Sequence, residues 1–520
     1  MNCDLFKSFR FRLIMISSFA WGILAHGTAL FYKISYHDDV PWFNGVGETY
    51  GLGRWALGMS GKAAEYLFSS HNYSTPVFNG LLTIAAVALI VYLLCDRLDI
   101  KSPVLTVALC GVMVCFPAVT NIFGYVFTAH YYYIGALLGV AGACYYYRSK
   151  NALSFVVCTL LMAFSTGLYQ SNITINLMTL LLLMLCEVMK EEMSFKDYIV
   201  LAVRNALICA CFMAEYFVFN IIALRITDIE MYDYKGVSSF GATGPGGYIL
   251  RVITAYKRFL RPVDFINYNG ASANMFPWNL KYLHMFLIVI TLALAVLMLL
   301  SLRSKVTALQ AGILIAVSPL FSYFIYVMVA EEDAHGGMAF GESFMFILTA
   351  YIVQKVMDDT ASDRVRLKKI LTAVSTSVML IMAILFARFA NVCYLKAQLM
   401  QAEAINYYNT LITSIRSTEG YTTDTPIAYI GERNKNDDAL KGEELFDPIY
   451  LPPYQGNSII NDFAWEETMN MWCGFSRVKP DPETLMGAVD EIASMPDYPD
   501  KGSIRMINGV IVVRFGEQTQ

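Results

Sequence analysis

Repeated apolar runs constrain this chain more strongly than any other feature. About eleven runs are long enough, or nearly so, to cross a bilayer. Only 15% of the residues are charged, whereas a soluble protein carries roughly 25%. Because backbone amides find no partners in hydrocarbon, such runs cross it as helices, and the sequence predicts a mainly α, polytopic membrane protein. The runs lie at residues 13–31, 79–95, 104–120, 127–147, 152–169, 173–189, 199–226, 282–302, 306–330, 342–357 and 370–390.

Lysine and arginine fall in alternate loops between the runs, and the short loops 121–126, 170–172 and 331–341 contain neither. Basic loops stay on the cytoplasmic side of a membrane. We therefore expect a cytoplasmic N-terminus and, after an odd number of spans, an outer C-terminal segment. The basic loops contain Arg97, Lys101, Arg148, Lys150, Lys190, Lys196, Arg303, Lys305, Arg364, Arg366, Lys368 and Lys369.

The composition changes near residue 390. Residues 1–390 hold the spans and two long outer loops, 32–78 and 227–281, and loops of such length are usually functional. Residues 391–520 contain no further membrane-length run and are again rich in Asp, Glu, Pro and Asn. We expect a transmembrane domain followed by a small extracytoplasmic α/β domain.

Two local patterns underlie the α/β assignment of the C-terminal domain. An amphipathic stretch at 395–416 predicts a helix. The apolar segments 504–507 and 510–513 flank Asn508-Gly509, a dipeptide that favours the type I′ turn of a β-hairpin.

The first outer loop gathers groups suited to a polar substrate. Asp38 and Asp39 stand side by side at the mouth of the membrane domain, where a carboxylate pair is costly to desolvate. They could also be a simple interfacial stop signal or the N-cap of a surface helix. The same loop contains His37, Glu48, Arg54 and Trp55 as candidate substrate-binding residues.

The second outer loop carries the cations Arg251, Lys257, Arg258 and Arg261. One or two of them could hold a phosphate, for which arginine offers a bidentate fork. Attraction to anionic lipid headgroups is the alternative explanation.

Further candidates for substrate binding lie at the outer ends of spans. Interfacial aromatic residues and solvated turns explain several of them without a function, whereas terminal amides can hydrogen-bond sugar hydroxyls. These candidates are His130, Tyr169, Gln170, Asn172, Glu332 and His335.

The chain resembles a known family in four features: the acidic pair, the Gly53-Arg54-Trp55 that follows, the Tyr169-Gln170-Ser171 turn, and an outer C-terminal domain. It is similar to the Gtr-type serotype-converting glucosyltransferases of bacterial inner membranes and, more broadly, to the GT-C superfamily. The similarity covers most of the membrane part up to about residue 390, and the C-terminal domain does not match the family.

The resemblance implies a multi-pass enzyme that moves a hexose, in this family glucose, from a polyprenyl-phosphate sugar to a surface polysaccharide such as the O-antigen of lipopolysaccharide. In such enzymes an acid of the first outer loop is catalytic, which maps onto Asp38 or Asp39. We take Asp38 as the base, supported by Asp39, by resemblance to related enzymes in which the first acid of a pair acts.

This chemistry requires a base for the acceptor hydroxyl, cations for the departing phosphate and a dry cleft. A single displacement would invert the anomeric centre. The sequence has no nucleotide-binding loop, in agreement with a lipid-linked donor. No Cys/His cluster has metal-ligand spacing, so no metal site is predicted, although the chemistry leaves room for a divalent ion. The net charge of −4 does not indicate a nucleic-acid partner.

Two other functions stay open at this stage. A flippase or transporter of lipid-linked sugars would have many spans, but such proteins usually carry mid-span ionisable residues and internal repeats. Here Arg204 and Glu215 are the notable polar residues within an apolar run, and no repeat is evident. A polysaccharide polymerase or ligase shares the lipid-linked chemistry.

Overall fold

The computed structural model of the chain describes residues 8–35, 37–190, 193–232, 243–260, 278–330, 334–359, 365–431 and 464–516. These residues form two compact units. The first unit contains the chain up to Lys33 and Trp42–Cys393. The second contains Ile34–Pro41 and the described residues from Tyr394 onward.

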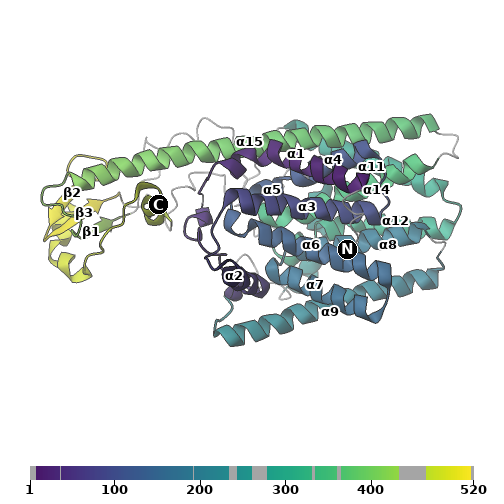
Figure 1. The fold of residues 1–520 in the computed structure, drawn as a ribbon, viewed down its shortest axis with the longest axis horizontal. Coiled ribbons are helices and arrows are strands. Elements are labelled where there is room, and N and C mark those ends of the chain that lie inside the picture. The colour runs from purple at the N-terminus through teal and green to yellow at the C-terminus, as the bar shows by residue number, and fades with distance from the viewer. Residues whose placement is uncertain are drawn as a thin grey trace. The chain divides into compact units, whose positions relative to one another are not determined.

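The first unit is a helical bundle whose long members run side by side (Figure 1). Each apolar run predicted from the sequence is largely helical, which confirms the predicted fold class. The helices are α1 (Phe9–Phe31), α3 (Pro76–Arg97), α4 (Pro103–Val114), α5 (Pro117–Ile122), α6 (Val126–Ser149), α7 (Ala152–Leu168), α8 (Asn172–Lys190), α9 (Phe195–Thr227), α11 (Trp278–Ser301), α12 (Lys305–Ser322), α14 (Phe344–Asp358) and the first part of α15 (Val365–Arg416). The run 104–120 is divided between α4 and α5, and the run 306–330 between α12 and the short α13 (Ile325–Met328).

In the described part of the chain, nine helical segments are long and apolar enough to cross a membrane, against about eleven predicted. The two predicted spans outside this group are α6 and α7. Helix α7 has only 17 residues. Helix α6 has 24 residues, but the tyrosine clusters 131–133 and 145–147 lower its hydropathy.

Several bundle helices begin with side chains suited to a helix N-terminus. Ser102, Asn151, Ser194 and Ser304 precede α4, α7, α9 and α12, and each accepts a hydrogen bond from the amide three residues later. Helices α3, α4 and α5 start with proline, whose fixed φ suits the first helical position. These caps divide neighbouring apolar runs into separate helices.

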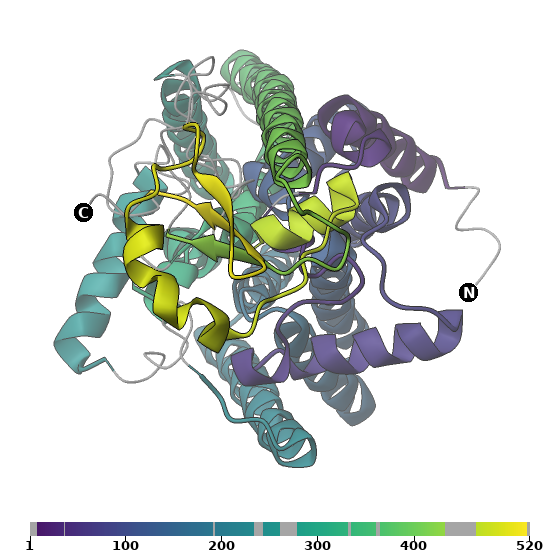
Figure 2. The same cartoon turned by 90° about the vertical axis from the view of Figure 1, so that its left-hand side faces the viewer.

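The two long loops contain further helices that the span pattern did not predict. Helix α2 (Trp55–Phe68) lies across the ends of the bundle helices rather than parallel to them (Figures 1 and 2). Helix α10 (Pro245–Leu260) is amphipathic and packs against α12 and the short α13 (Ile325–Met328). The 3-10 helix η3 (Gly336–Ser343) leads into α14.

The second unit contains a three-stranded sheet in the order β1-β3-β2 (Figure 2). Strand β1 (Ile427–Ile430) pairs with β3 (Val510–Arg514) in parallel, and β2 (Ile504–Ile507) pairs with β3 antiparallel. The connecting Asn508 and Gly509 have φ of 50° and 79°, both positive as a type I′ turn requires, so the predicted hairpin is confirmed.

The described helices of this unit include α16 (Trp465–Cys473), η6 (Pro482–Ala488), α17 (Val489–Ala493) and the end of α15. Ile492 of α17 and Met495 pack with Val510 and Val512 of β3 in a small apolar core. The predicted span 370–390 and the predicted amphipathic helix 395–416 form one continuous helix of 52 residues. No Gly or Pro interrupts it.

Candidate functional site

The acidic pair lies in the short 3-10 helix η1 (His37–Asp39). Asp39 is fully buried, whereas Asp38 is half-buried. The segment that carries the pair belongs to the second unit, where the backbone N–H of Ser35 donates to Gln401 Oε1 at 2.9 Å. The two carboxylates are therefore held by a segment that packs with α15, a placement that the sequence did not indicate.

Arg54 is the first cation after the pair, and it follows a tight turn. The 3-10 helix η2 (Tyr50–Leu52) ends at Gly53, whose φ of 72° is left-handed and therefore favours glycine. A Cβ at this position would lie 2.7 Å from the hydroxyl oxygen of Tyr216 and 3.2 Å from Gln170 Nε2. Both the backbone conformation and the available space thus require glycine directly before Arg54.

The same two side chains hold the turn in place. The hydroxyl of Tyr216, from α9, donates to the carbonyl oxygen of Gly53 at 3.1 Å. The amide of Gln170, from the connection between α7 and α8, donates to the carbonyl oxygen of Leu52. Two parts of the bundle far apart in sequence therefore position the backbone at Arg54.

The side chain of Arg54 contacts a pair of tyrosines. Its Nη1 donates to the hydroxyl of Tyr132 at 3.1 Å. Its Cζ lies 5.8 Å from the centroid of the Tyr132 ring and 5.5 Å from that of Tyr169. These two rings stack at 4.1 Å with an angle of 8°. The Asn172 amide donates to the backbone carbonyls of Tyr132 and Ser165, at 3.3 and 3.1 Å. It therefore helps to position the backbone that carries the Tyr132 ring.

A cavity of about 280 Å³ opens beside Arg54. Its polar lining comes from Arg54, Tyr169, Gln170, Ser171, Tyr216 and Asn220. The Oδ1 of Asn220 is buried with no hydrogen-bond partner among the described residues. The rest of the lining is apolar and includes four methionines, whose flexible side chains adapt to irregular ligands. The apolar lining residues include Met213, Phe217, Ile221, Leu224, Met231, Ile325, Met328, Val329 and Met338.

The arrangement is a half-buried guanidinium at one edge of an apolar pocket. Both lie in the helical membrane unit, which begins before the acidic pair in the sequence. Comparison with family profiles matches residues 27–348 to the glucosyl transferase GtrII family, over more than half of the chain. The chain belongs to the GtrII glucosyltransferase family. The match confirms the resemblance seen in the sequence and shows that the chain is a glycosyltransferase. Comparisons with curated proteins and with solved structures gave no match.

The GtrII match includes the acidic pair, Arg54 and the cavity, and it ends before α15. Tyr132, Tyr216 and Asn220 were not among the site residues predicted from the sequence. Tyr216 and Asn220 lie in the apolar run 199–226, and a polar residue inside such a run is the signal that could have identified them.

The cations of α10 take different positions in this GtrII-family chain. Arg251 Nη1 donates to the carbonyl oxygens of Val327 and Met328, at 3.3 and 3.2 Å, and so holds the end of α13. Arg258 is buried, with its Cζ 5.7 Å from the centroid of the Tyr326 ring. Both contacts fasten α10 to α13. Lys257 is exposed.

A buried acid that the sequence analysis did not single out faces Arg258. Glu342, at the end of η3, is 3% exposed, and the hydroxyls of Tyr323 and Tyr326 and the guanidinium of Arg258 are its polar neighbours. Glu342 was hidden inside the predicted span 342–357. Since α13 supplies Ile325 and Met328 to the cavity lining, this cluster holds that wall of the cavity in place.

The remaining predicted substrate-binding residues lie in varied surroundings. Glu48 is exposed and accepts from the Tyr232 hydroxyl at 3.0 Å. Trp55 is 4% exposed and packs between Phe164 of α7 and Phe219 of α9, a placement that favours a packing role.

Two histidines from the prediction have distinct partners. His130 is half-buried, its ring lies 4.1 Å from that of Tyr131, and its Nδ1 has no hydrogen-bond partner among the described residues. His335 caps η3, and its Nδ1 accepts from the backbone N–H of Gly337 at 3.2 Å.

Arg261, Glu332 and the side chain of His37 lie outside the described residues, so their predicted roles stay predictions. Within the described ranges, no group of three or more His, Cys, Asp and Glu side chains is placed to hold a metal ion.

Proposed function

We propose that this glucosyltransferase moves glucose from a polyprenyl-phosphate donor to a surface polysaccharide such as O-antigen, on the outer side of a bacterial inner membrane. The observation that carries the proposal is the position of Arg54 beside an otherwise largely apolar cavity of about 280 Å³. An anionic head joined to a hydrocarbon chain complements such a site.

The donor's phosphate group is a diester with a single negative charge, and one arginine offsets that charge. Arg54 is oriented by the Tyr132 hydroxyl and by two tyrosine rings, which reduces the entropy lost when the phosphate binds. The first isoprene units of the donor would lie along Met213, Phe217 and Ile221, which recur at helical spacing on one face of α9.

Polar groups near Arg54 suit the sugar. The unpartnered Oδ1 of Asn220 would accept a hydrogen bond from a hydroxyl, and a buried acceptor gains most when such a donor arrives. Gln170 and Tyr216 hold the turn through their donor groups, so in this account they position Arg54 rather than select the sugar.

The transfer is a single displacement. The acceptor hydroxyl oxygen forms a bond to C1 of the glucosyl group while the bond from C1 to the phosphate oxygen breaks. The electron pair of the broken bond stays on polyprenyl phosphate, and the hydroxyl proton passes to a carboxylate. Attack opposite the leaving group inverts C1. Arg54 would stabilise the second negative charge that develops on the phosphate.

We assign the base to Asp38 and a supporting role to Asp39. Asp38 is half-buried and has accessible surface, whereas Asp39 is fully buried and suited to fixing its neighbour. The base must take a proton from a bulky polysaccharide, and such an acceptor can reach only an accessible carboxylate.

The proposed orientation has the N-terminus in the cytoplasm and the C-terminal unit outside. It rests on the alternation of lysine- and arginine-containing loops with loops that lack both. A lipid-linked donor and a surface acceptor both require the site to face the outer side.

Mass spectrometry of surface glycans from cells with and without the gene tests the function. The proposal predicts polysaccharide repeats that are heavier by one hexose only when the gene is present. Loss of whole polysaccharide chains in the absence of the gene would instead indicate a flippase, a polymerase or a ligase. Unchanged glycans would show that a surface polysaccharide is not the acceptor.

A further inference from the structure

A second cavity, of about 500 Å³, lies between α4, α14 and α15, on the face of the first unit where the basic loops gather. None of its lining residues belongs to the Arg54 site. Its lining includes Ser102, Val104, Asp359, Lys368, Lys369 and Leu380. We call it the basic groove.

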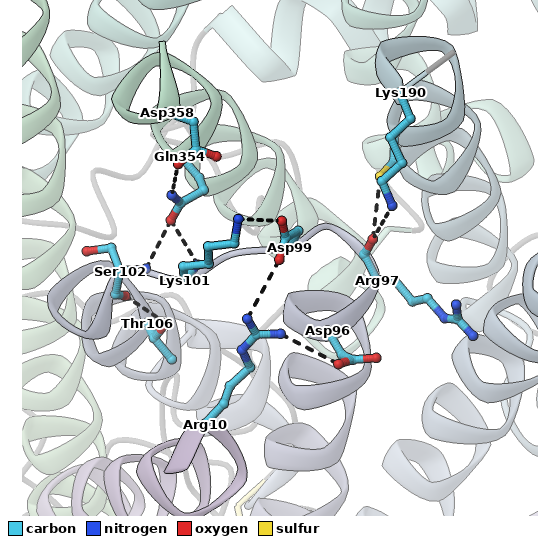
Figure 3. A network of polar contacts seen from close by, with 11 residues as sticks. Arg10, Asp96, Arg97, Asp99, Lys101, Ser102, Thr106, Lys190, Gln354 and Asp358 are labelled. Carbon is cyan, nitrogen blue, oxygen red and sulfur yellow. Dashed lines mark hydrogen bonds and ion pairs between the residues drawn. The ribbon is translucent and has the colours of Figure 1, made fainter. Parts of the chain in front are cut away.

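A polar network fixes one wall of the basic groove (Figure 3). Gln354 of α14 accepts from the backbone amides of Lys101 and Ser102, at 2.9 and 3.0 Å, and donates to Asp358 at 2.9 Å. Thr106 donates to the Ser102 carbonyl at 2.9 Å. The start of α4 is therefore tied to the end of α14 before any ligand binds.

Asp96 and Asp99, two of the acids near this wall, have cationic partners of their own, whereas Asp358 accepts from the Gln354 amide. Arg10 lies 3.5 Å from Asp96 and 3.8 Å from Asp99, and Lys101 lies 2.8 Å from Asp99 (Figure 3). The Asp99 carboxylate, which accepts a hydrogen bond from Lys101, raises the pKa of that ammonium group. These neutralised acids do not oppose an anion in the groove.

The groove itself carries a positive excess. Lys368 is 4% exposed and pairs with Asp359 at 2.5 Å, so these two charges offset each other. Lys369 is exposed, and no carboxylate of the described residues lies within ion-pair distance of it. The hydroxyl oxygen of Ser102 accepts from the Leu105 amide, which leaves its proton to donate. An anion therefore meets one uncompensated cation and one hydroxyl donor.

The groove continues into apolar surroundings along α15. Lys369 and Leu380, eleven positions apart on this helix, are separated by about 16 Å at the helical rise. Val104, 60% exposed, contributes to the opposite side. Half of a bilayer's hydrocarbon core is about 15 Å thick, so the groove matches the depth of one leaflet. A small soluble anion would use only its basic end.

We propose that the basic groove binds an anionic glycerophospholipid from the leaflet on this face. Lys369 and Ser102 hold the phosphate, and an acyl chain lies between Val104 and Leu380. The Lys368–Asp359 pair stays intact and positions Lys369 on α15. The lipid would brace the ends of α4 and α14 against α15, independently of glucosyl transfer.

Native mass spectrometry of the full chain tests this site, with phosphatidylglycerol or phosphatidylcholine of identical acyl chains added to detergent-purified protein. We expect the wild type to retain phosphatidylglycerol preferentially. Lys369→Gln should lower its retention about fivefold, equivalent to ~1 kcal/mol. Lys196→Gln removes an exposed cation outside the groove and should have no effect.

A second variant distinguishes binding inside the groove from attraction by charge alone. Ala373 lines the groove and is exposed, so Ala373→Trp should fill the space and lower phosphatidylglycerol retention while the charge stays constant. Equal retention in the wild type, Lys369→Gln and Ala373→Trp would overturn the proposal. Displacement of the lipid by glycerol phosphate at equal concentration would also overturn it, because it would identify a site for a soluble phosphate.

Discussion

Arg54 donates a hydrogen bond to the hydroxyl of Tyr132 at 3.1 Å, which ties the first predicted outer loop to α6 beside the cavity. The Tyr132 ring in turn stacks on that of Tyr169, so one guanidinium is oriented by residues from two helix ends. This relationship distinguishes Arg54 from the α10 arginines, which are engaged in fastening α10 to α13.

Replacing Arg54 should weaken use of the donor. Arg54→Gln removes a charge-assisted contact worth ~1.5–3 kcal/mol, so we expect transfer at limiting donor to fall roughly ten- to a hundredfold. Lys257→Gln, which removes an exposed cation, should have little effect. The assay is transfer rate against donor concentration in proteoliposomes. If both variants kept the wild-type dependence on donor, Arg54 would not be the phosphate ligand.

Gly53→Ala should destabilise the membrane unit. The substitution introduces a left-handed alanine and a Cβ close to the Tyr216 hydroxyl oxygen, at a cost of about 1–3 kcal/mol. The thermal unfolding midpoint in detergent should fall. Gly487→Ala is the control, since nothing lies within 4 Å of a Cβ at that position. Equal midpoints for the two variants would show that the turn is less constrained than the contacts indicate.

Arg258 and Glu342 should be coupled energetically. Arg258→Met leaves the buried acid without its cationic neighbour, which is expected to cost about 3 kcal/mol. The double variant Arg258→Met/Glu342→Gln should recover part of that stability, and the exposed control Lys257→Met should cost little. A double-mutant cycle on unfolding midpoints measures the coupling. Additive effects would mean that the two side chains do not interact.

Reporter fusions test the proposed orientation. A reporter that is active only outside the cytoplasm should work when fused after residue 520, and it should be silent when fused in the loop that contains Arg148 and Lys150. A silent reporter in a fusion after residue 520 that is present in the membrane would show that the number of spans is even.

Local sequence signals predicted much of this fold. The apolar runs predicted the bundle because hydrocarbon permits few alternatives to a helix. Asn508 and Gly509 predicted the hairpin because few residue pairs accept positive φ in succession. The parallel pairing of β1 with β3 joins residues about eighty positions apart, and no local pattern encodes such a contact.

The residues of the candidate site were harder to predict from the sequence than the fold was. Arg54 and Gln170 were predicted from their loop positions, but the structure shows that Gln170 bonds the backbone of the Arg54 turn. Asn220 and Glu342 lay inside runs whose hydrophobicity masked them. The anchoring of the Asp38 segment through Ser35 to Gln401 depends on a contact across 366 positions.

The most direct test of the account is glucosyl transfer by purified protein in proteoliposomes, with radiolabelled polyprenyl-phosphate glucose and a lipid-linked polysaccharide acceptor. The wild type should transfer label, and Asp38→Asn should lower turnover by roughly a hundredfold or more while donor binding persists, because the amide keeps the shape but cannot accept the proton. Normal turnover in Asp38→Asn would reject Asp38 as the base, and normal turnover in both Asp38→Asn and Asp39→Asn would contradict the carboxylate mechanism itself.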